Sequence, residues 1–195
     1  MINMKQNQTI YKHPLNPIYN THSRILILGS FPSVISREEQ FYYAHPRNRF
    51  WKVLYELFEI TESKAIKQEK HYKIQFLEQH HIALWDIAQK CTINKSKDST
   101  MQNVIPNDIT LILSQANINA IFCNGNKTHE LFWHFFNKTM QLCDKYKSIK
   151  VFSLPSSSPA NAKYSLAKLI EAWSIIKNYN TPYITASLTD KQIKN

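Results

Sequence analysis

Glycine is nearly absent from this chain, which has only Gly29 and Gly125 among its 195 residues. Loops of the G-x-x-x-x-G-K-[ST] and G-x-G-x-x-G types need several glycines, because their backbone must approach a phosphate closely. Two isolated glycines exclude both loop types, and the G-x-S-x-G turn of serine hydrolases is missing as well. Both glycines directly follow an apolar run, so we expect each to lie where a strand ends against another group.

Cysteine is also scarce, and its spacing excludes several kinds of site. The three cysteines, Cys91, Cys123 and Cys143, are scattered and form no C-x-x-C pair. This spacing argues against a disulfide framework, a structural zinc site and an iron–sulfur cluster. The H-E-x-x-H pattern of zinc hydrolases is absent too.

Long apolar stretches are missing. No run approaches the roughly 20 apolar residues that a membrane-spanning helix needs. Residues 1–17 contain no apolar core of the kind found in signal peptides. From these two absences we expect a cytoplasmic protein that has no membrane partner.

Acidic residues are few relative to basic ones. The chain has 24 Lys and Arg against 14 Asp and Glu, a net charge of +10 and a pI near 9.5. This balance favours a polyanionic partner, of which nucleic acid is the commonest. Aromatic residues make up 12% of the chain, and rings can stack on bases while Lys and Arg hold phosphates. The alternative is a composition bias without a binding function.

Apolar runs alternate with helical patterns along the chain, which predicts a parallel α/β sandwich. The expected strands cover residues 25–28, 82–87, 120–124 and 150–154. The expected helices cover residues 46–58, 61–80, a short stretch ending near 116, residues 128–142 and a stretch that begins at Pro159. Residues 89–108 are predicted to form a long polar loop. Candidate site residues follow the strands, where α/β enzymes build their sites.

The first strand leads into a loop that is rich in groups able to recognise a base. These groups are an amide, an imidazole, aromatic rings and guanidiniums, from Asn48, His45, Phe31, Tyr42, Tyr43, Arg47 and Arg49. Rings can sandwich a flat heterocycle while an amide reads its edge or holds a water. The alternatives are that Tyr42 and Tyr43 belong to the core and that Asn48 lies in a first helical turn, with His45 or a neighbour as the cap.

The last strand leads into a second loop, which contains three consecutive serines, Ser156 to Ser158. Serines at the beginning of a helix supply N–H and O–H donors together with the positive end of the helix dipole. We therefore interpret this loop as a phosphate-binding site. The alternative is that Ser158 and Pro159 form an ordinary helix cap.

Five separated motifs, in this order, resemble the uracil-DNA glycosylase superfamily, and most closely its hypoxanthine-DNA glycosylase branch, family 6. They are GSFPS from Gly29, YYAHPRNRFW from Tyr42, IALWDI from Ile82 with a later Lys-Asp-Ser, FCNG from Phe122 and LPSSSPAN from Leu154. The resemblance covers roughly residues 24–175. The HPxNxFW element is also similar to mismatch-specific uracil/thymine glycosylases.

The resemblance implies a three-layer α/β/α sandwich with a central four-stranded, mainly parallel sheet. It implies a monofunctional, metal-free enzyme without a cofactor, which hydrolyses the N-glycosidic bond of a damaged base in double-stranded DNA during base excision repair. We expect an N-terminal arm over residues 1–23, a single glycosylase domain over 24–178 and a C-terminal tail over 179–195. A monomer suits an enzyme that scans a duplex.

The resemblance also implies how the chemistry is divided. In most branches the first motif supplies an acidic or amide residue two places after its glycine, and this residue handles the attacking water. Here that place holds Phe31, and the hypoxanthine branch shares this departure. The resemblance therefore assigns the water to Asn48. His45 is the second catalytic candidate, as a hydrogen-bond or proton donor to the leaving base.

Two further sets of residues complete the expected site. The base pocket is expected to consist of Gly29, Ser30, Phe31, Pro32, Ser33, Tyr42, Tyr43 and Asn124. Contacts with DNA are expected from Arg47, Ser156, Ser157, Ser158, Pro159, Asn161 and Lys163.

Two other functions are compatible with the sequence. A non-catalytic nucleic-acid-binding α/β protein would have the same basic and aromatic residues. A glycosylase with uracil as its main substrate would have the same fold. The sequence leaves open the preferred base, the opposing base, the strand preference and whether the N-terminal arm or residues 89–108 contact DNA.

Overall fold

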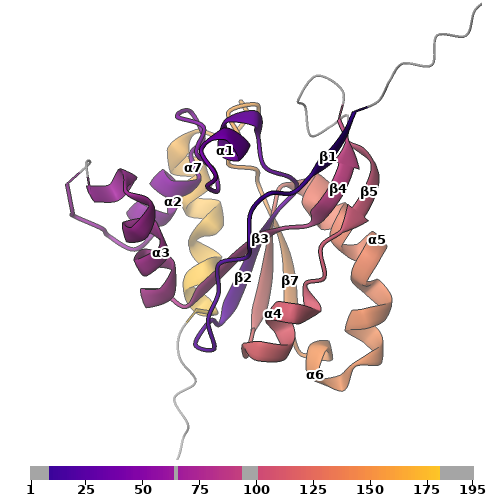
Figure 1. The fold of residues 1–195 in the computed structure, drawn as a ribbon. Helices are drawn as coiled ribbons and strands as arrows, with labels where there is room; N and C mark the ends of the chain where they lie inside the picture. The colour runs from indigo at the N-terminus through magenta and orange to yellow at the C-terminus, as the bar shows by residue number, and fades with distance from the viewer. Residues whose placement is uncertain (1–8, 64–65, 94–100, 181–195) are drawn as a thin grey trace, which may run out of the picture.

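A parallel sheet of four strands forms the centre of the protein (Figure 1). The structure is a computed structural model that describes residues 9–63, 66–93 and 101–180. The strand order is β3-β2-β6-β7, with β2 at Ile25–Gly29, β3 at Ile82–Asp86, β6 at Ala120–Asn124 and β7 at Lys150–Leu154. Strands β2, β3 and β6 are buried along their whole length, as continuous apolar runs in a parallel sheet require.

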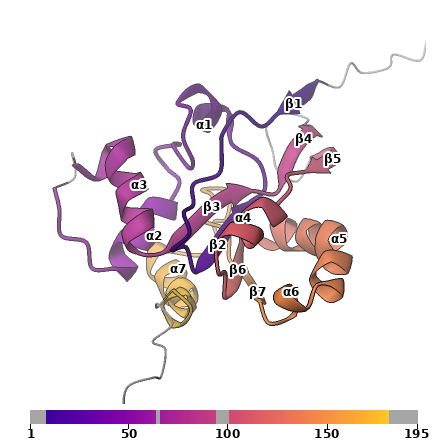
Figure 2. The same cartoon turned by 60° about the horizontal axis from the view of Figure 1, so that its bottom comes forward.

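Helices cover both faces of this sheet (Figures 1 and 2). One face carries α2 (Phe50–Leu57), α3 (Lys70–Gln79) and α7 (Leu166–Trp173). The other carries α4 (Thr110–Gln115), α5 (Asn126–Leu142) and α6 (Asp144–Lys147). Short 3-10 segments lie at Ile66–Gln68 and Ser174–Asn178. The predicted three-layer α/β/α sandwich is confirmed. Within the described residues, no helix has the length and apolar character to cross a bilayer.

A second, smaller sheet lies beside the carboxyl ends of the central strands (Figure 1). It is antiparallel, with the order β1-β4-β5, and consists of β1 at Ile10–Lys12, β4 at Ala88–Thr92 and β5 at Gln102–Pro106. The prediction of a loop over residues 89–108 is therefore wrong for both flanks of that range. The mixed polar sequence of β4 conceals it, because a bulged strand in a small antiparallel sheet does not need a continuous apolar run. Residues 94–100 lie outside the described residues.

The N-terminal segment is part of the folded body from residue 9 onward. Ile18 forms a bridge with Leu84 through N–O distances of 2.9 and 2.8 Å. His13 is buried, and its Nε2 lies 2.9 Å from Asp86 Oδ2. These contacts attach residues 10–18 of the expected N-terminal arm to β3 and β4. At the other end, Asn180 donates from Nδ2 to the carbonyl of His80 at 3.3 Å, and residues 181–195 lie outside the described residues.

Two helices begin later than their proline signals predict. Helix α2 begins at Phe50 instead of Pro46, because residues 45–48 form a turn in which Asn48 N–H donates to the His45 carbonyl at 2.8 Å. Helix α7 begins at Leu166 instead of Pro159, with Ser165 as the N-cap that accepts from Lys168 N–H at 3.3 Å. The short helix α1 (Val34–Glu38), whose N-cap is Ser33, was not predicted from the sequence.

Gly29 is at the end of β2, where two polar side chains lie close to its backbone. It pairs with Asp86 in the register of β2 and β3. A Cβ on Gly29 would lie 2.1 Å from Asp86 Oδ1 and 2.7 Å from the Tyr43 hydroxyl. Such distances are too short for non-bonded atoms, so glycine is required by the space that the carboxylate occupies.

Gly29→Ala is expected to lower the free energy of unfolding by about 1–3 kcal/mol, because the new methyl group overlaps a buried carboxylate. Urea unfolding followed by circular dichroism measures the change. In the Gly29→Ala/Asp86→Ala double variant the overlap is removed. The double variant should therefore lose less stability than the sum of the losses in the two single variants. Wild-type stability in Gly29→Ala would show that the carboxylate does not occupy this space.

Candidate active site

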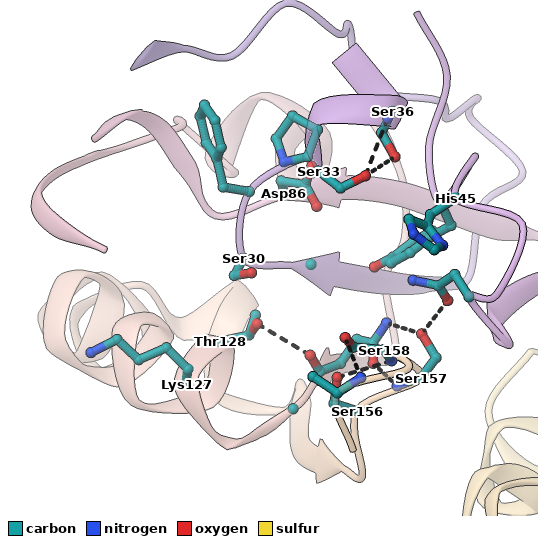
Figure 3. A pocket seen from close by; sticks show the side chains of 18 of the residues that line it. Ser30, Ser33, Ser36, His45, Asp86, Lys127, Thr128, Ser156, Ser157 and Ser158 are labelled. Carbon is teal, nitrogen blue, oxygen red and sulfur yellow. Dashed lines mark hydrogen bonds between the residues drawn. The ribbon is translucent and has the colours of Figure 1, made fainter. Parts of the chain in front are cut away.

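A cavity of about 630 Å³ opens at the carboxyl ends of the central strands (Figure 3). Segments that follow β2, β3, β6 and β7 line it, which is the position that a parallel α/β sheet predicts. Most of the expected site residues line this cavity: Gly29, Ser30, Phe31, Pro32, Ser33, Tyr42, Tyr43, His45, Asn48, Asn124, Ser156, Ser157, Ser158, Pro159 and Asn161. Arg47 and Lys163 do not line the cavity and are exposed to solvent.

Asn48 is held by its side-chain oxygen. Its Oδ1 accepts from Phe50 N–H at 3.0 Å and from Ser157 Oγ at 3.0 Å. A backbone N–H can only donate, so the accepting atom must be the amide oxygen and the orientation of the amide is fixed. The NH₂ group of Asn48 is therefore the end that these two bonds leave for other partners.

Ser157 connects Asn48 to the end of β6. Ser157 is 0% exposed, and its N–H donates to Asn124 Oδ1 at 2.9 Å. Asn124 Nδ2 donates in return to Ser157 Oγ at 2.9 Å. The hydroxyl proton of Ser157 is then left for Asn48 Oδ1, so every donor and acceptor in this chain of hydrogen bonds has one possible direction. Because each of these bonds has one possible direction, the network holds Ser157, Asn124 and the Asn48 oxygen in fixed orientations.

Arg49 binds the loop that contains Ser156, Ser157 and Ser158, the serine loop, to the beginning of α2. Its guanidinium donates to four carbonyls: those of Ser157 at 3.3 Å, Ser158 at 2.6 Å, Asn161 at 3.0 Å and Tyr164. Its backbone N–H also donates to the Ser157 carbonyl at 3.1 Å. Arg49 therefore shapes the site instead of contacting a substrate. The sequence identifies Arg49 only as one of two arginines in the first loop. Its partners lie in a loop 108 residues away, which the sequence alone does not indicate.

The serine loop folds on itself and does not begin a helix. Ser158 N–H donates to Ser156 Oγ at 3.2 Å, and Asn161 Nδ2 donates to the Ser156 carbonyl at 2.9 Å. Because α7 begins at Leu166, the loop does not lie at the N-terminus of the helix that follows it, and this part of the predicted phosphate site is wrong. The donors of the loop are nevertheless at the cavity wall.

The aromatic residues of the first loop divide into packing residues and cavity residues. Tyr42 is 3% exposed, its hydroxyl donates to the Asn16 carbonyl at 2.8 Å, and burial, with the charge of Asp86, raises the pKa of this phenol far above its ordinary value. Tyr42 is therefore a neutral hydrogen-bond donor that belongs to the core as well as to the cavity wall. Tyr43 stacks on Phe50 with ring centroids 3.8 Å apart. The rings of Phe31 and His13 pack edge to face, with their centroids 5.8 Å apart.

The structure adds residues that the sequence did not indicate. Arg37 lines the cavity, and its guanidinium lies 5.6 Å from the Phe31 ring centroid. Asp86 lines it as the last residue of β3, in contact with His13. The position of Asp86 at a strand end was the available signal, whereas His13 comes from a segment predicted to be outside the domain. Among the described residues, no group of three or more His, Cys, Asp and Glu could hold a metal ion.

Comparisons with known proteins agree on one family. Residues 17–177 match the family model of the uracil DNA glycosylase superfamily. The chain is 27% identical over 120 residues to a hypoxanthine DNA glycosylase from Methanosarcina barkeri, covering 61% of this chain and 74% of that protein. It is 28% identical over 150 residues to a hypoxanthine DNA glycosylase from Methanosarcina acetivorans, covering 76% of this chain and 87% of that protein.

A solved structure supports the same fold. It is the solution NMR structure of a candidate uracil DNA glycosylase from Methanosarcina acetivorans, with a TM-score of 0.66. The likeness covers 87% of this chain and 99% of that chain at 24% sequence identity. Similarity at this level shows that the two chains share their α/β architecture.

Arg49→Lys is expected to loosen the serine loop, because an ammonium on a flexible stem cannot donate to four carbonyls at once. Removal of these charge-assisted bonds should cost about 1–3 kcal/mol of stability. Hydrogen exchange of residues 156–165 should become faster, and the thermal midpoint should fall. Arg47→Lys is the matched control, because Arg47 is exposed and should leave both measurements unchanged. Equal exchange in the two variants would contradict the assignment.

Proposed function

This chain belongs to the uracil DNA glycosylase superfamily, and we propose that it excises a deaminated base from duplex DNA, with hypoxanthine as its main substrate. The observation that carries the proposal is the cavity in which the HPRN turn, residues 45–48, and the serine loop meet. There Ser157 Oγ lies 3.0 Å from Asn48 Oδ1. The two motifs are 109 residues apart in the chain, yet they form one wall. The names of the two curated relatives support hypoxanthine over uracil.

The first step is extrusion of the damaged nucleotide into the cavity. Unstacking and unpairing a base costs a few kcal/mol, and costs less for a base that is already poorly paired. A volume of about 630 Å³ accommodates a purine. The net charge of +10 favours the phosphates, and contacts with the backbone offset the cost of extrusion. Arg47 and Lys163, exposed outside the cavity, are the basic residues assigned to the phosphates.

The second step is cleavage of the N-glycosidic bond through an oxocarbenium-like sugar. Phe31 and Tyr43 offer ring faces and edges to the flipped base. Asn48 places its NH₂ group toward the cavity, where it can hold the oxygen of a water near the anomeric carbon. A neutral amide is a poor base, so Asn48 acts by orienting the water. The electron pair of the broken bond leaves with the base, and the water supplies the hydroxyl and a proton.

His45 is the candidate donor to the leaving base. Its Nδ1 accepts from Arg47 N–H at 3.1 Å, so in the neutral ring the proton is on Nε2. The ring lines the cavity and is half-buried. A hydrogen bond from Nε2 to N7 or O6 of hypoxanthine would stabilise the negative charge that develops on the base.

Incubation with duplexes that carry a single deoxyinosine, deoxyuridine or deoxyxanthosine tests the activity, with alkali cleavage of the abasic site as the readout. Strand cleavage is expected with deoxyinosine at a higher single-turnover rate than with deoxyuridine. The absence of cleavage in all three duplexes would favour the alternative function, a nucleic-acid-binding protein without catalysis. Cleavage of the uracil duplex alone would exclude hypoxanthine as the main substrate.

Asn48→Ala is expected to lower the single-turnover rate by about two to four orders of magnitude, which corresponds to several kcal/mol of transition-state stabilisation. Affinity for an undamaged duplex, measured by fluorescence anisotropy, should change little. Ser157→Ala leaves Asn48 its bond from Phe50 N–H and should cost about tenfold, as expected for one hydrogen bond. An unchanged rate in Asn48→Ala would remove Asn48 from the mechanism.

A further inference from the structure

Two lysines lie directly opposite each other in the small antiparallel sheet, and the mechanism above uses neither. Lys12 of β1 pairs with Lys90 of β4, in a regular register that also pairs Ile10 with Thr92. These two lysines are the only charged residues of β1, β4 and β5. No ion pair among the described residues includes either of them. The described part of the protein therefore leaves this concentration of positive charge without a counter-charge.

The hydrogen bonds between β1 and β4 place the two side chains close together. His13 N–H donates to the Gln89 carbonyl at 2.7 Å, so the positions next to the lysines form a hydrogen-bonded pair. Such pairs alternate with non-hydrogen-bonded pairs in an antiparallel ladder, so Lys12 and Lys90 are a pair of the second kind. Directly opposite side chains have Cβ atoms about 4.5–5.5 Å apart, and non-hydrogen-bonded pairs are the closer ones. Like charges at this spacing destabilise a sheet.

We propose that Lys12 and Lys90 together bind one phosphate of the DNA backbone beside the extruded nucleotide. The inference rests on the proposed function only in taking duplex DNA as the partner. A phosphate between two ammonium groups accepts hydrogen bonds from both of them, and each of these bonds is strengthened by charge. The repulsion between the lysines in the free protein is then offset when the phosphate binds.

The two faces of β1 have different neighbours. Because side chains alternate along an extended chain, Tyr11 and His13 point to one face and Lys12 points to the other. His13 contacts Asp86 in the cavity wall, at 2.9 Å. The guanidinium of Arg37, which also lines the cavity, lies 4.8 Å from the Tyr11 ring centroid. One face of the small sheet is therefore part of the cavity wall, and the opposite face carries the lysines.

The lysine pair is close enough to the cavity to contact a neighbouring phosphate. The small sheet lies beside the carboxyl ends of the central strands (Figure 1). Ile93, which lines the cavity, is three residues after Lys90, or about 10 Å of extended chain. Phosphates of one DNA strand follow each other by about 3.4 Å along the helix axis, so several of them lie within this range of an extruded nucleotide. The flexible stem of a lysine lets its ammonium group adjust to one of them.

The pair extends the proposed DNA contacts to a second side of the cavity. Lys163 follows the serine loop, whereas Lys12 precedes His13, which contacts Asp86. Figure 3 shows Asp86 across the cavity from the Ser156–Ser158 loop. Phosphate contacts on two sides of the extruded nucleotide fix the register of the duplex over the cavity, without any dependence on the base sequence.

Lys12→Gln tests the proposal, because it removes one charge and keeps a polar side chain. The dissociation constant is measured by fluorescence anisotropy with a duplex that has a tetrahydrofuran abasic analogue in place of the damaged nucleotide. It is expected to rise about tenfold, and the slope of log affinity against log salt should become shallower by about 1. The urea midpoint of the free protein at low salt should rise instead of fall, because the repulsion is removed.

Lys138→Gln is the matched control for the loss of one charge. Lys138 is exposed on α5, twelve residues and about 18 Å of helix beyond Asn126 at its cavity end. It should change neither the dissociation constant nor the urea midpoint by a comparable amount. Equal effects of Lys12→Gln and Lys138→Gln on binding would show that only the net charge matters, and this result overturns the inference.

A neutral methylphosphonate, moved through the DNA strand one position at a time, identifies the phosphate. At one position near the analogue it is expected to weaken binding of the wild-type protein about tenfold. At the same position it should have no effect on the Lys12→Gln/Lys90→Gln double variant, which has already lost the contact. The same losses in both proteins at every position overturn the inference, whatever bases the protein excises. If the protein binds as expected but excises no base, the proposed function fails and the inference stands.

Discussion

One buried serine joins three of the chain segments that line the site. Ser157 accepts from Asn124 at the end of β6 and donates to Asn48 in the HPRN turn. Its own position is fixed by its backbone, through Asn124 on one side and Arg49 on the other. Because the hydroxyl is both donor and acceptor, it is the one group in this network that transmits orientation from the rigid sheet to Asn48. The direction in which the Asn48 amide points is therefore a property of the fold and not of the turn alone.

The fold was predictable to the extent that it depends on burial. The four apolar runs became four parallel strands, because a strand buried on both faces tolerates few polar residues. The starts of α2 and α7 were predicted wrongly because Pro46 and Pro159 fit a turn as well as a first helical position. The turn before α2 and the loop before α7 are held together by the Arg49 side chain, whose carbonyl partners belong to a loop more than 100 residues later. Such a contact cannot be predicted from the residues that neighbour either proline.

The candidate site was predictable for a different reason. Asn48 and Ser157 belong to the segments that follow β2 and β7, and parallel strands bring all their carboxyl ends to one edge. His13 could not be placed this way, because it precedes the first strand of the central sheet and reaches the site through the small antiparallel sheet. Asp86 was visible as a strand end, but the importance of a carboxylate depends on its partner, and that partner was the residue that the sequence concealed.

The distribution of charge in the cavity constrains the chemistry. At the place where most of the superfamily has an acidic or amide residue, this chain has Phe31, and the carboxylate that does line the cavity is tied to His13 and lies over Gly29. In the proposed mechanism a water near Asn48 is consequently oriented without a strong base, so the barrier depends mainly on how well the departing base carries negative charge. A base with a carbonyl next to a ring N–H carries that charge better than its parent amine. Under the proposed function, deamination therefore makes a base a better leaving group, so the reactivity of the substrate itself favours deaminated bases.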